Sequence, residues 1–246
     1  LRLGTKTLTI MSTRNSLSRR RRQGRRNRRN NRARNGESPS KVLKVRGINS
    51  FAPPRVITTL SFFKTGIMSS GVLPTIAQRL FPSNAYDIDP IFASSAMPGF
   101  TEWAGMYRSF RTLKASIAIE FTNLMSAPVS IFLVPVNYDP GSSVTLSVAT
   151  TLSSQPNSKV AILSPLGGQD RATLRSKARV NQFAGAMSNA VDAFTGATNG
   201  SVSPVQFWGF SYGAIAQGTS TISPGVGVTI KLLVELEFFE LTTPTT

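Results

Sequence analysis

The chain has neither cysteine nor histidine among its 246 residues. Without cysteine, no disulfide framework or thiolate metal site can hold the fold. Without histidine, the chain lacks the usual general base near neutral pH and the commonest zinc ligand. Most hydrolase and metalloenzyme designs are thereby disfavoured, and no P-loop spacing is present. We therefore expect a protein that is not an enzyme.

Acidic residues are scarce, and their scarcity is uneven along the chain. Eleven Asp and Glu stand against 28 Lys and Arg, which gives a formal net charge of +17. The first 46 residues carry +15 of this charge, and the remainder carries +2. Because 40% of the chain is hydrophobic, the remainder can bury a sizeable core. The charge distribution indicates a cationic N-terminal segment in front of a nearly neutral folded body.

Long apolar runs are missing too. None reaches about eighteen residues, so membrane insertion is not expected. Two segments instead alternate with a period of two, which is typical of strands with one buried face. The residues expected to face inward are Leu113, Ala115, Ile117, Ile119 and Phe121 in the first segment, and Val228, Ile230, Leu232, Val234, Leu236 and Phe238 in the second.

Further runs of β-branched and aromatic residues bring the expected number of strands to about eight. These runs are Arg55–Lys64, Val129–Val136, Val144–Thr151, Lys159–Leu163, Arg171–Val180 and Val205–Ile215. Turns rich in Gly and Pro separate them, which favours a sandwich or barrel. We expect helices at Thr101–Phe110 and across Phe183–Phe194. The long stretch from Lys64 to Phe110 is expected to be an excursion that contacts neighbouring copies.

The strongest local signal is the arginine-rich stretch RNSLSRRRRQGRRNRRNNRAR. It contains eleven arginines and no acid, so it cannot bury enough surface to fold alone. Guanidinium groups stay charged and pair bidentately with phosphate, which favours nucleic-acid binding with little sequence preference. A nuclear-localisation signal or a solvated tail fits the same pattern. The arginines expected to bind nucleic acid are Arg14, Arg19, Arg20, Arg21, Arg22, Arg25, Arg26, Arg28, Arg29, Arg32 and Arg34.

We divide the chain into a disordered arm, residues 1–40, and a folded domain, residues 41–246. Met11, followed by Ser and Thr, is the expected true start, which would place residues 1–10 upstream of it. Between arm and body, residues 35–40 contain Gly, Pro and Ser and indicate a hinge.

A second basic feature is RATLRSKARV. If it is a strand, Arg171, Arg175, Lys177 and Arg179 project from one face. That face could line an interior that holds nucleic acid. Outward charges in contact with water explain the pattern equally well.

Three carboxylates in turns, Asp87, Asp89 and Asp139, offer the hard oxygen ligands that calcium prefers. Turn carboxylates more often cap local backbone amides, and we favour that interpretation. Calcium is the one cofactor that the sequence brings into consideration. Four aromatic residues, Trp103, Tyr107, Trp208 and Tyr212, are expected in the core or an interface rather than stacked on bases.

The arginine-rich arm, the hinge and the strands together resemble the single jelly-roll coat proteins of small non-enveloped icosahedral viruses. The resemblance spans the chain from Met11. Its most telling stretches are MYRSFRTLKASIAIEFTN, Met106–Asn123, which is similar to the aromatic-rich lead into a shell strand, and SIFLVPVNYDPGSS, Ser130–Ser143, which is similar to a strand followed by a Tyr-Asp turn.

The resemblance implies an all-β fold, an eight-stranded antiparallel jelly-roll sandwich with short helical excursions. It implies closed shells of 60 copies or a multiple of 60, in the virion and, during assembly, in the host cytoplasm or nucleus. The partner implied is the single-stranded viral genome, and we favour RNA slightly over DNA. Genome binding is carried over only to the arm arginines, because that motif alone is present as such.

Two other classes of protein compete with this interpretation. A cellular nucleic-acid-binding protein of the ribosomal or RNA-chaperone type would have a similar basic tail. Such a protein needs a base-reading surface, for which a nearly neutral body with few exposed-looking aromatics is poorly suited. An enzyme on a jelly-roll scaffold would need a metal or an acid–base set, and cupin-like sites rely heavily on histidine, which this chain lacks.

Overall fold

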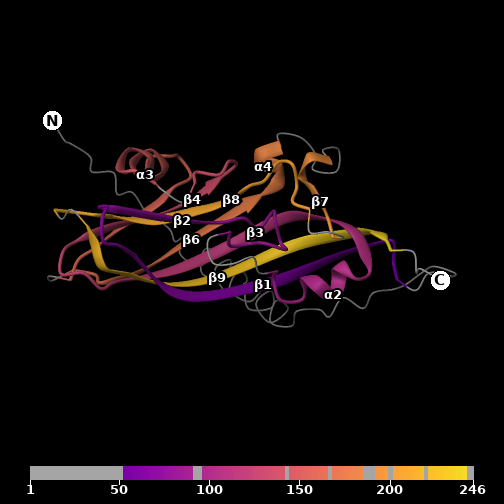
Figure 1. Cartoon of the computed structure of the whole chain (residues 1–246), viewed down its shortest axis with the longest axis horizontal. Helices are drawn as coiled ribbons and strands as arrows, with labels where there is room; N and C mark the ends of the chain where they lie inside the picture. Colours follow the sequence, from indigo (N-terminus) through magenta and orange to yellow (C-terminus); the bar gives the residue numbers. More distant parts are fainter. Residues whose placement is uncertain are drawn as a thin grey trace, which may run out of the picture. The chain divides into compact units, whose positions relative to one another are not determined.

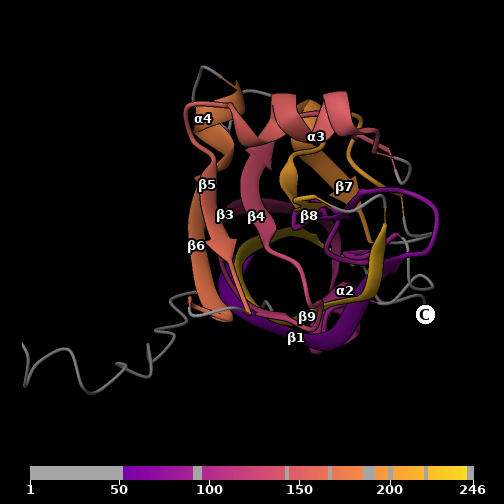
Figure 2. The same ribbon diagram turned by 90° about the vertical axis from the view of Figure 1, so that its left-hand side faces the viewer.

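Two antiparallel sheets make up most of the described structure (Figures 1 and 2). The computed structural model describes residues 52–90, 96–141, 144–165, 168–184, 192–198, 202–218 and 221–242, which lie within the unit Gly47–Thr246. The arginine-rich stretch, residues 14–34, lies outside the described residues. The expected disorder of the arm, residues 1–40, therefore stays a prediction.

The strands, in chain order, are β1 (Arg55–Ser70), β2 (Thr75–Leu80), β3 (Tyr107–Asn123), β4 (Val129–Val136), β5 (Lys159–Leu163), β6 (Arg171–Arg179), β7 (Thr195–Ala197), β8 (Gly209–Ala216) and β9 (Ile222–Leu241). The helical segments are α2 (Phe100–Ala104), α3 (Leu146–Ser153), α4 (Val180–Ala184) and the 3-10 turn η2 (Asp192–Phe194). In the described part of the chain, no helix has the length and hydropathy needed to cross a bilayer.

The strand order identifies the topology as a jelly roll. The first sheet runs β1-β9-β3-β6 and the second runs β2-β8-β4-β5, while the short β7 pairs with β3 beside the first sheet. Hydrogen-bonded neighbours are therefore mostly distant in sequence, and the chain crosses repeatedly between the sheets. All the pairs are antiparallel. This is the eight-stranded double Greek key of a jelly roll, so the predicted fold class is confirmed.

The alternation in β9 and β3 explains why these strands lie at the centre of the first sheet. All six residues of β9 that were predicted to face inward are buried, and so are those of β3 from Ala115 to Phe121. The prediction for Leu113 was wrong, because the register shifts between Thr112 and Lys114. At this bulge Thr112 turns inward instead, and its hydroxyl donates to the Pro82 carbonyl at 2.7 Å.

One predicted strand is a helix. Residues 144–151 were expected to be extended, but α3 occupies Leu146–Ser153. The Thr145 hydroxyl caps its first turn by accepting from the Val148 amide at 3.4 Å. Ala149 and Leu152, three positions apart, are buried in a small cluster with residues of β2 and β4, so helical spacing buries the apolar residues here.

Three boundaries also differ from the predictions. The stretch from Lys64 to Phe110 contains the end of β1 and all of β2, whose polar Gln and Arg hid its alternation. The helix expected at Thr101–Phe110 ends at Ala104, and β3 begins at Tyr107. The strand expected from Val205 begins at Gly209. Of the helix expected across Phe183–Phe194, only α4 and η2 are described, and residues 185–191 lie outside the described residues.

The core between the sheets is rich in aromatic residues. Tyr107, Trp208 and Tyr212 are fully buried, and Trp103 packs half-buried against this core. Trp103 stacks on Phe238 with ring centroids 6.0 Å apart, and Trp208 stacks on Phe183 with ring centroids 5.5 Å apart. Their expected place in the core is thereby confirmed.

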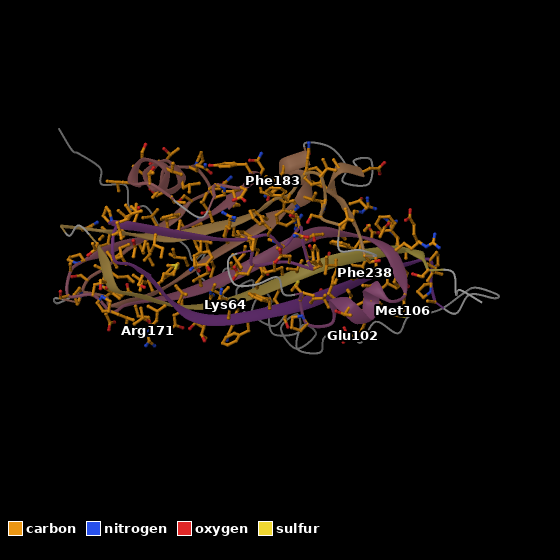
Figure 3. All side chains as sticks on the ribbon, in the orientation of Figure 1. Lys64, Glu102, Met106, Arg171, Phe183 and Phe238 are labelled. Carbon is orange, nitrogen blue, oxygen red and sulfur yellow. The ribbon has the colours of Figure 1, made fainter. Side chains whose placement is uncertain are left out.

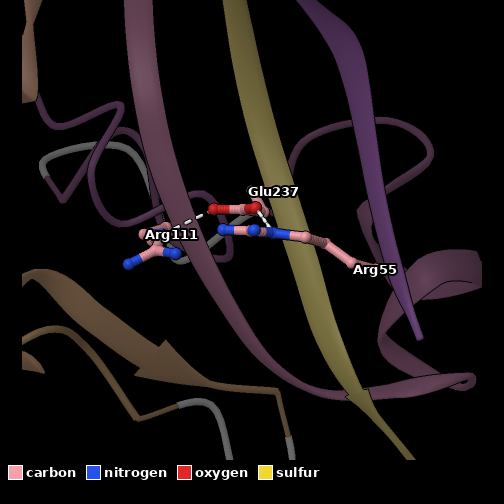
Figure 4. Close-up of polar contacts among 3 residues, drawn as sticks. All are labelled: Arg55, Arg111 and Glu237. Atoms are coloured by element: carbon pink, nitrogen blue, oxygen red, sulfur yellow. Dashed lines mark hydrogen bonds and ion pairs between the residues drawn. The ribbon is translucent and has the colours of Figure 1, made fainter. Parts of the chain in front are cut away.

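One buried carboxylate breaks the alternation of β9. Glu237 lies between two arginines of the neighbouring strands, Arg55 of β1 and Arg111 of β3 (Figure 4). The Arg111 Nε donates to Glu237 at 2.6 Å, and the Arg111 guanidinium lies 5.2 Å from the Phe239 ring centroid. Burial lowers the pKa of Arg111, Arg55 lowers it further, and Asp192 opposes both effects. Glu237 thus ties together three adjacent strands of the first sheet.

We expect Glu237→Gln to destabilise the subunit by on the order of 3 kcal/mol, because removal of one partner leaves buried charge uncompensated. Urea unfolding of the dissociated subunit measures the change. The matched control is Glu120→Gln on the exposed face of the same sheet, where the ion pair with Arg171 should be worth about 0–1 kcal/mol. Equal losses of stability in the two variants would contradict the structural role given to Glu237.

Gly213 of β8 is expected to tolerate no side chain. A Cβ there would collide with the Ile76 carbonyl oxygen and lie 2.7 Å from the Phe132 ring. Gly213→Ala should therefore lower stability by about 1–3 kcal/mol through overpacking. Gly66→Ala is the control, because nothing lies within 4 Å of its Cβ position. Thermal unfolding of both variants tests this, and an unchanged Tm for Gly213→Ala would refute it.

Candidate nucleic-acid interface

The edge strand β6 presents a row of cations on one face. Leu174 and Ala178 point inward and are buried, whereas the four basic residues predicted to share the other face, Arg171, Arg175, Lys177 and Arg179, are exposed. The predicted placement of these four basic residues on one exposed face of a strand is thus confirmed. Figure 3 shows Arg171 toward the end of the sandwich opposite Glu102 and Met106.

Two further lysines join this row from the adjacent strands. Lys114 of β3 lies opposite Arg179, and Ala118 of β3 lies between Arg175 and Lys231 of β9. We call the six cations the basic face: Lys114, Arg171, Arg175, Lys177, Arg179 and Lys231. The alternation within a single strand does not reveal these two lysines, because strand pairing brings them beside β6; both occupy outward positions in the predicted strands.

Acidic side chains neutralise only part of the basic face. Arg171 pairs with Glu120 at 3.2 Å, and Lys114 pairs with Glu235 at 2.7 Å. Within the described ranges, no ion pair is found for the other four cations, Arg175, Lys177, Arg179 and Lys231. These four retain their capacity to bind an external anion.

A hollow of about 620 Å³ adjoins the basic face where β6 approaches β5. Its described lining includes Arg175, Lys177 and Lys231, and Lys159 adds a fourth cation from the second sheet. Pro135, Pro156 and Leu233 provide apolar surface, and no aromatic ring is among the described lining residues. Such a lining suits phosphate and sugar contacts, which carry little sequence information, better than base stacking.

The three candidate calcium ligands do not form one cluster. In the described residues, no group of three or more acidic side chains is placed to hold a metal ion. Asp139 pairs with Arg79 at 3.0 Å and accepts from the Gly141 amide at 2.8 Å, as expected of a turn cap. Asp89 is buried and pairs with Lys64 of β1. Burial, and then the nearby Asp89 charge, raise the pKa of Asp87.

The pentapeptide GFSYG, Gly209–Gly213, formally matches the G-x-S-x-G pattern of serine hydrolases. That pattern places its serine on a sharp turn from strand to helix. Here Ser211 lies fully buried within β8, and its hydroxyl donates to the Gln78 carbonyl at 3.4 Å. The match therefore lacks the structural context of a nucleophile.

No family model matches this chain, and no curated protein sequence matches it. Among solved structures, the Macrobrachium rosenbergii nodavirus virus-like particle aligns with a TM-score of 0.45 and 12% identity, over 82% of this chain and 92% of that one. A Penaeus vannamei nodavirus capsid protein, solved as a subviral particle, gives 0.43 and 14%, over 75% and 98%. Desmodium yellow mottle tymovirus gives 0.42 and 14%, over 81% and 95%. At such scores and identities, the likeness does not by itself assign a function.

We expect Arg175→Gln combined with Lys177→Gln to weaken the salt dependence of binding to a single-stranded RNA homopolymer. For each phosphate contact that the variant loses, the magnitude of the slope of log K against log salt should fall by about 0.7. Fluorescence titrations between about 50 and 200 mM salt measure this slope. Arg108→Gln is the control, because Arg108 is exposed on the part of β3 that precedes its pairing with β6. A slope unchanged in the double variant would exclude the basic face from binding.

Proposed function

We propose that the chain is the coat protein of a small non-enveloped icosahedral virus. It assembles with copies of itself into a closed shell and packages a single-stranded genome through its arginine-rich arm. The observation that carries the proposal is the division of charge: eleven arginines without an acid in residues 14–34, in front of a jelly-roll body whose charges nearly balance.

The jelly roll alone does not select this function, since capsid, lectin and cupin domains share it. Cupin-like chemistry relies heavily on histidine, and this chain has none. The arm distinguishes the remaining alternatives, because a dense arginine run neutralises phosphates without reading bases. A nearly neutral body is also suited to packing beside copies of itself, because identical bodies with a large net charge would repel one another.

The magnitude of the arm charge fits genome packaging. At +15 for each N-terminal segment, 60 copies supply roughly 900 positive charges and 180 copies roughly 2,700, comparable with the phosphates of a genome of some thousands of nucleotides. The basic face adds a second, weaker contribution from the folded body. The arm is thus the main source of neutralising charge.

Deletion of residues 14–34 tests the proposal. The intact chain should form uniform particles that contain nuclease-sensitive nucleic acid, visible by electron microscopy and by the ratio of absorbance at 260 and 280 nm. The deleted form should keep its β-rich circular dichroism but lose most of the packaged nucleic acid, because the main source of neutralising charge is gone.

Two outcomes would contradict the proposal. A deleted form that retains as much nucleic acid as the intact chain at moderate salt would remove the arm from packaging. An intact chain that stays monomeric at high concentration with nucleic acid present would reject the coat-protein function. Digestion with ribonuclease and deoxyribonuclease then identifies the nucleic acid.

A further inference from the structure

The two edges of the first sheet differ sharply in charge. At one edge, β6 carries four exposed cations in nine residues. At the other edge, β1 runs for 16 residues and pairs with β9 alone among the described strands. Its exposed face from Ile57 to Ile67 carries no charge, and Ile57, Phe63 and Ile67 are 54%, 61% and 61% exposed.

Open edge strands usually carry features that prevent pairing with another chain, such as charges, prolines, bulges or short length. The exposed face of β1 lacks these over most of its length. Its one lysine, Lys64, is on the inward-facing row, where it pairs with Asp89. The register with β9 stays regular until Met68, and no proline occurs within the strand. An exposed and uncharged edge of this length, with three large apolar side chains among its six outward residues, indicates a strand that is paired in the assembled state.

We propose that β1 pairs with β1 of a second copy, antiparallel across a two-fold axis, so that the first sheets of two subunits form one continuous sheet. This interface deepens the proposed self-assembly by naming the surface through which two copies associate. The sequence of β1 allows two antiparallel copies of the strand to pair without unfavourable contacts. Pairing centred on Ser61 places Phe63 opposite Thr59, and Ile57 opposite Thr65, so no like charges meet along this span.

The same pairing is unfavourable at the opposite edge. Two antiparallel copies of β6 would bring four cations of one chain against four of the other, and like charges directly opposite are destabilising. The charge pattern therefore selects β1 as the edge that pairs. In addition, a two-fold axis perpendicular to the sheet leaves the basic faces of both copies on the same side, where one nucleic acid can contact both.

Disulfide trapping tests the interface directly, because the natural chain contains no cysteine. Single cysteines at three exposed positions of β1, Thr59, Ser61 and Thr65, are introduced into the full chain. Residues near the two-fold axis bring identical Cβ atoms within bonding range, about 4 Å. At least one variant, with Ser61→Cys favoured, should give a covalent dimer under mild oxidation, whereas Thr173→Cys on the exposed face of β6 should not.

Phe63→Lys supplies a second measurement. It should weaken dimerisation, followed by analytical ultracentrifugation in high salt, by about tenfold or more, because each copy brings a lysine into an uncharged edge. The control Ile162→Lys alters another exposed apolar residue, on β5 of the second sheet, and should leave dimerisation unchanged. Circular dichroism establishes that both variants are folded.

The outcomes separate this interface from the proposed function. Particles that form while no β1 cysteine cross-links overturn the β1 interface and leave the coat-protein function standing. Dimers that cross-link through β1 without ever forming particles support the interface and reject the shell. Cross-linking as strong from Thr173→Cys as from β1 would show nonspecific collision and overturn the interface. The interface would also be overturned if residues 41–51 of the same chain paired with β1. That pairing would be detected as protection of a β1 cysteine from a thiol reagent in the monomer.

Discussion

The burial of one apolar face of each sheet against the other is the interaction on which the rest of the structure depends. The inward rows of β3 and β9 supply much of this core, and the rings of Tyr107, Phe110, Phe121 and Phe238 fill it from the first sheet. Because side chains alternate along each strand, the same pairing that buries one row holds the opposite row on the outer face. The basic face therefore follows from the core, since Leu174 and Ala178 cannot point inward unless Arg175 and Lys177 point outward.

Charged side chains of the folded body are also arranged so that several of its acidic groups pair with nearby basic groups. The buried carboxylate of Glu237 is held between two arginines, so this acid is not left without a partner when neighbouring side chains cover it. On the outer face, Glu120 and Glu235 each engage one cation of the basic face and leave the others available. The result is a body close to neutral overall whose described residues include a locally cationic surface, which complements the proposed division of labour with the arm.

The fold was largely predictable from the sequence because its two longest strands alternate over most of their length. The errors arose where tertiary contacts override local pattern. Thr112 and Leu113 exchange faces at a bulge that no periodicity reveals, and residues 146–153 form a helix because Thr145 caps it and the second sheet receives its apolar side. The cations of β6 were found from their spacing, whereas Lys114 and Lys231 required the register between strands. The role of the arm arginines remains a prediction from composition.

The position of β9 also constrains when the molecule can become complete. This strand is the last of the described strands in chain order, yet it lies between β1 and β3 and forms hydrogen bonds with both. During translation, β1 and β3 cannot pair with the strand that they share until residues 222–241 have left the ribosome. The first sheet, and any surface that depends on it, therefore forms only after synthesis of these residues, and until then the unpaired edges of β1 and β3 stay open to contact with other chains.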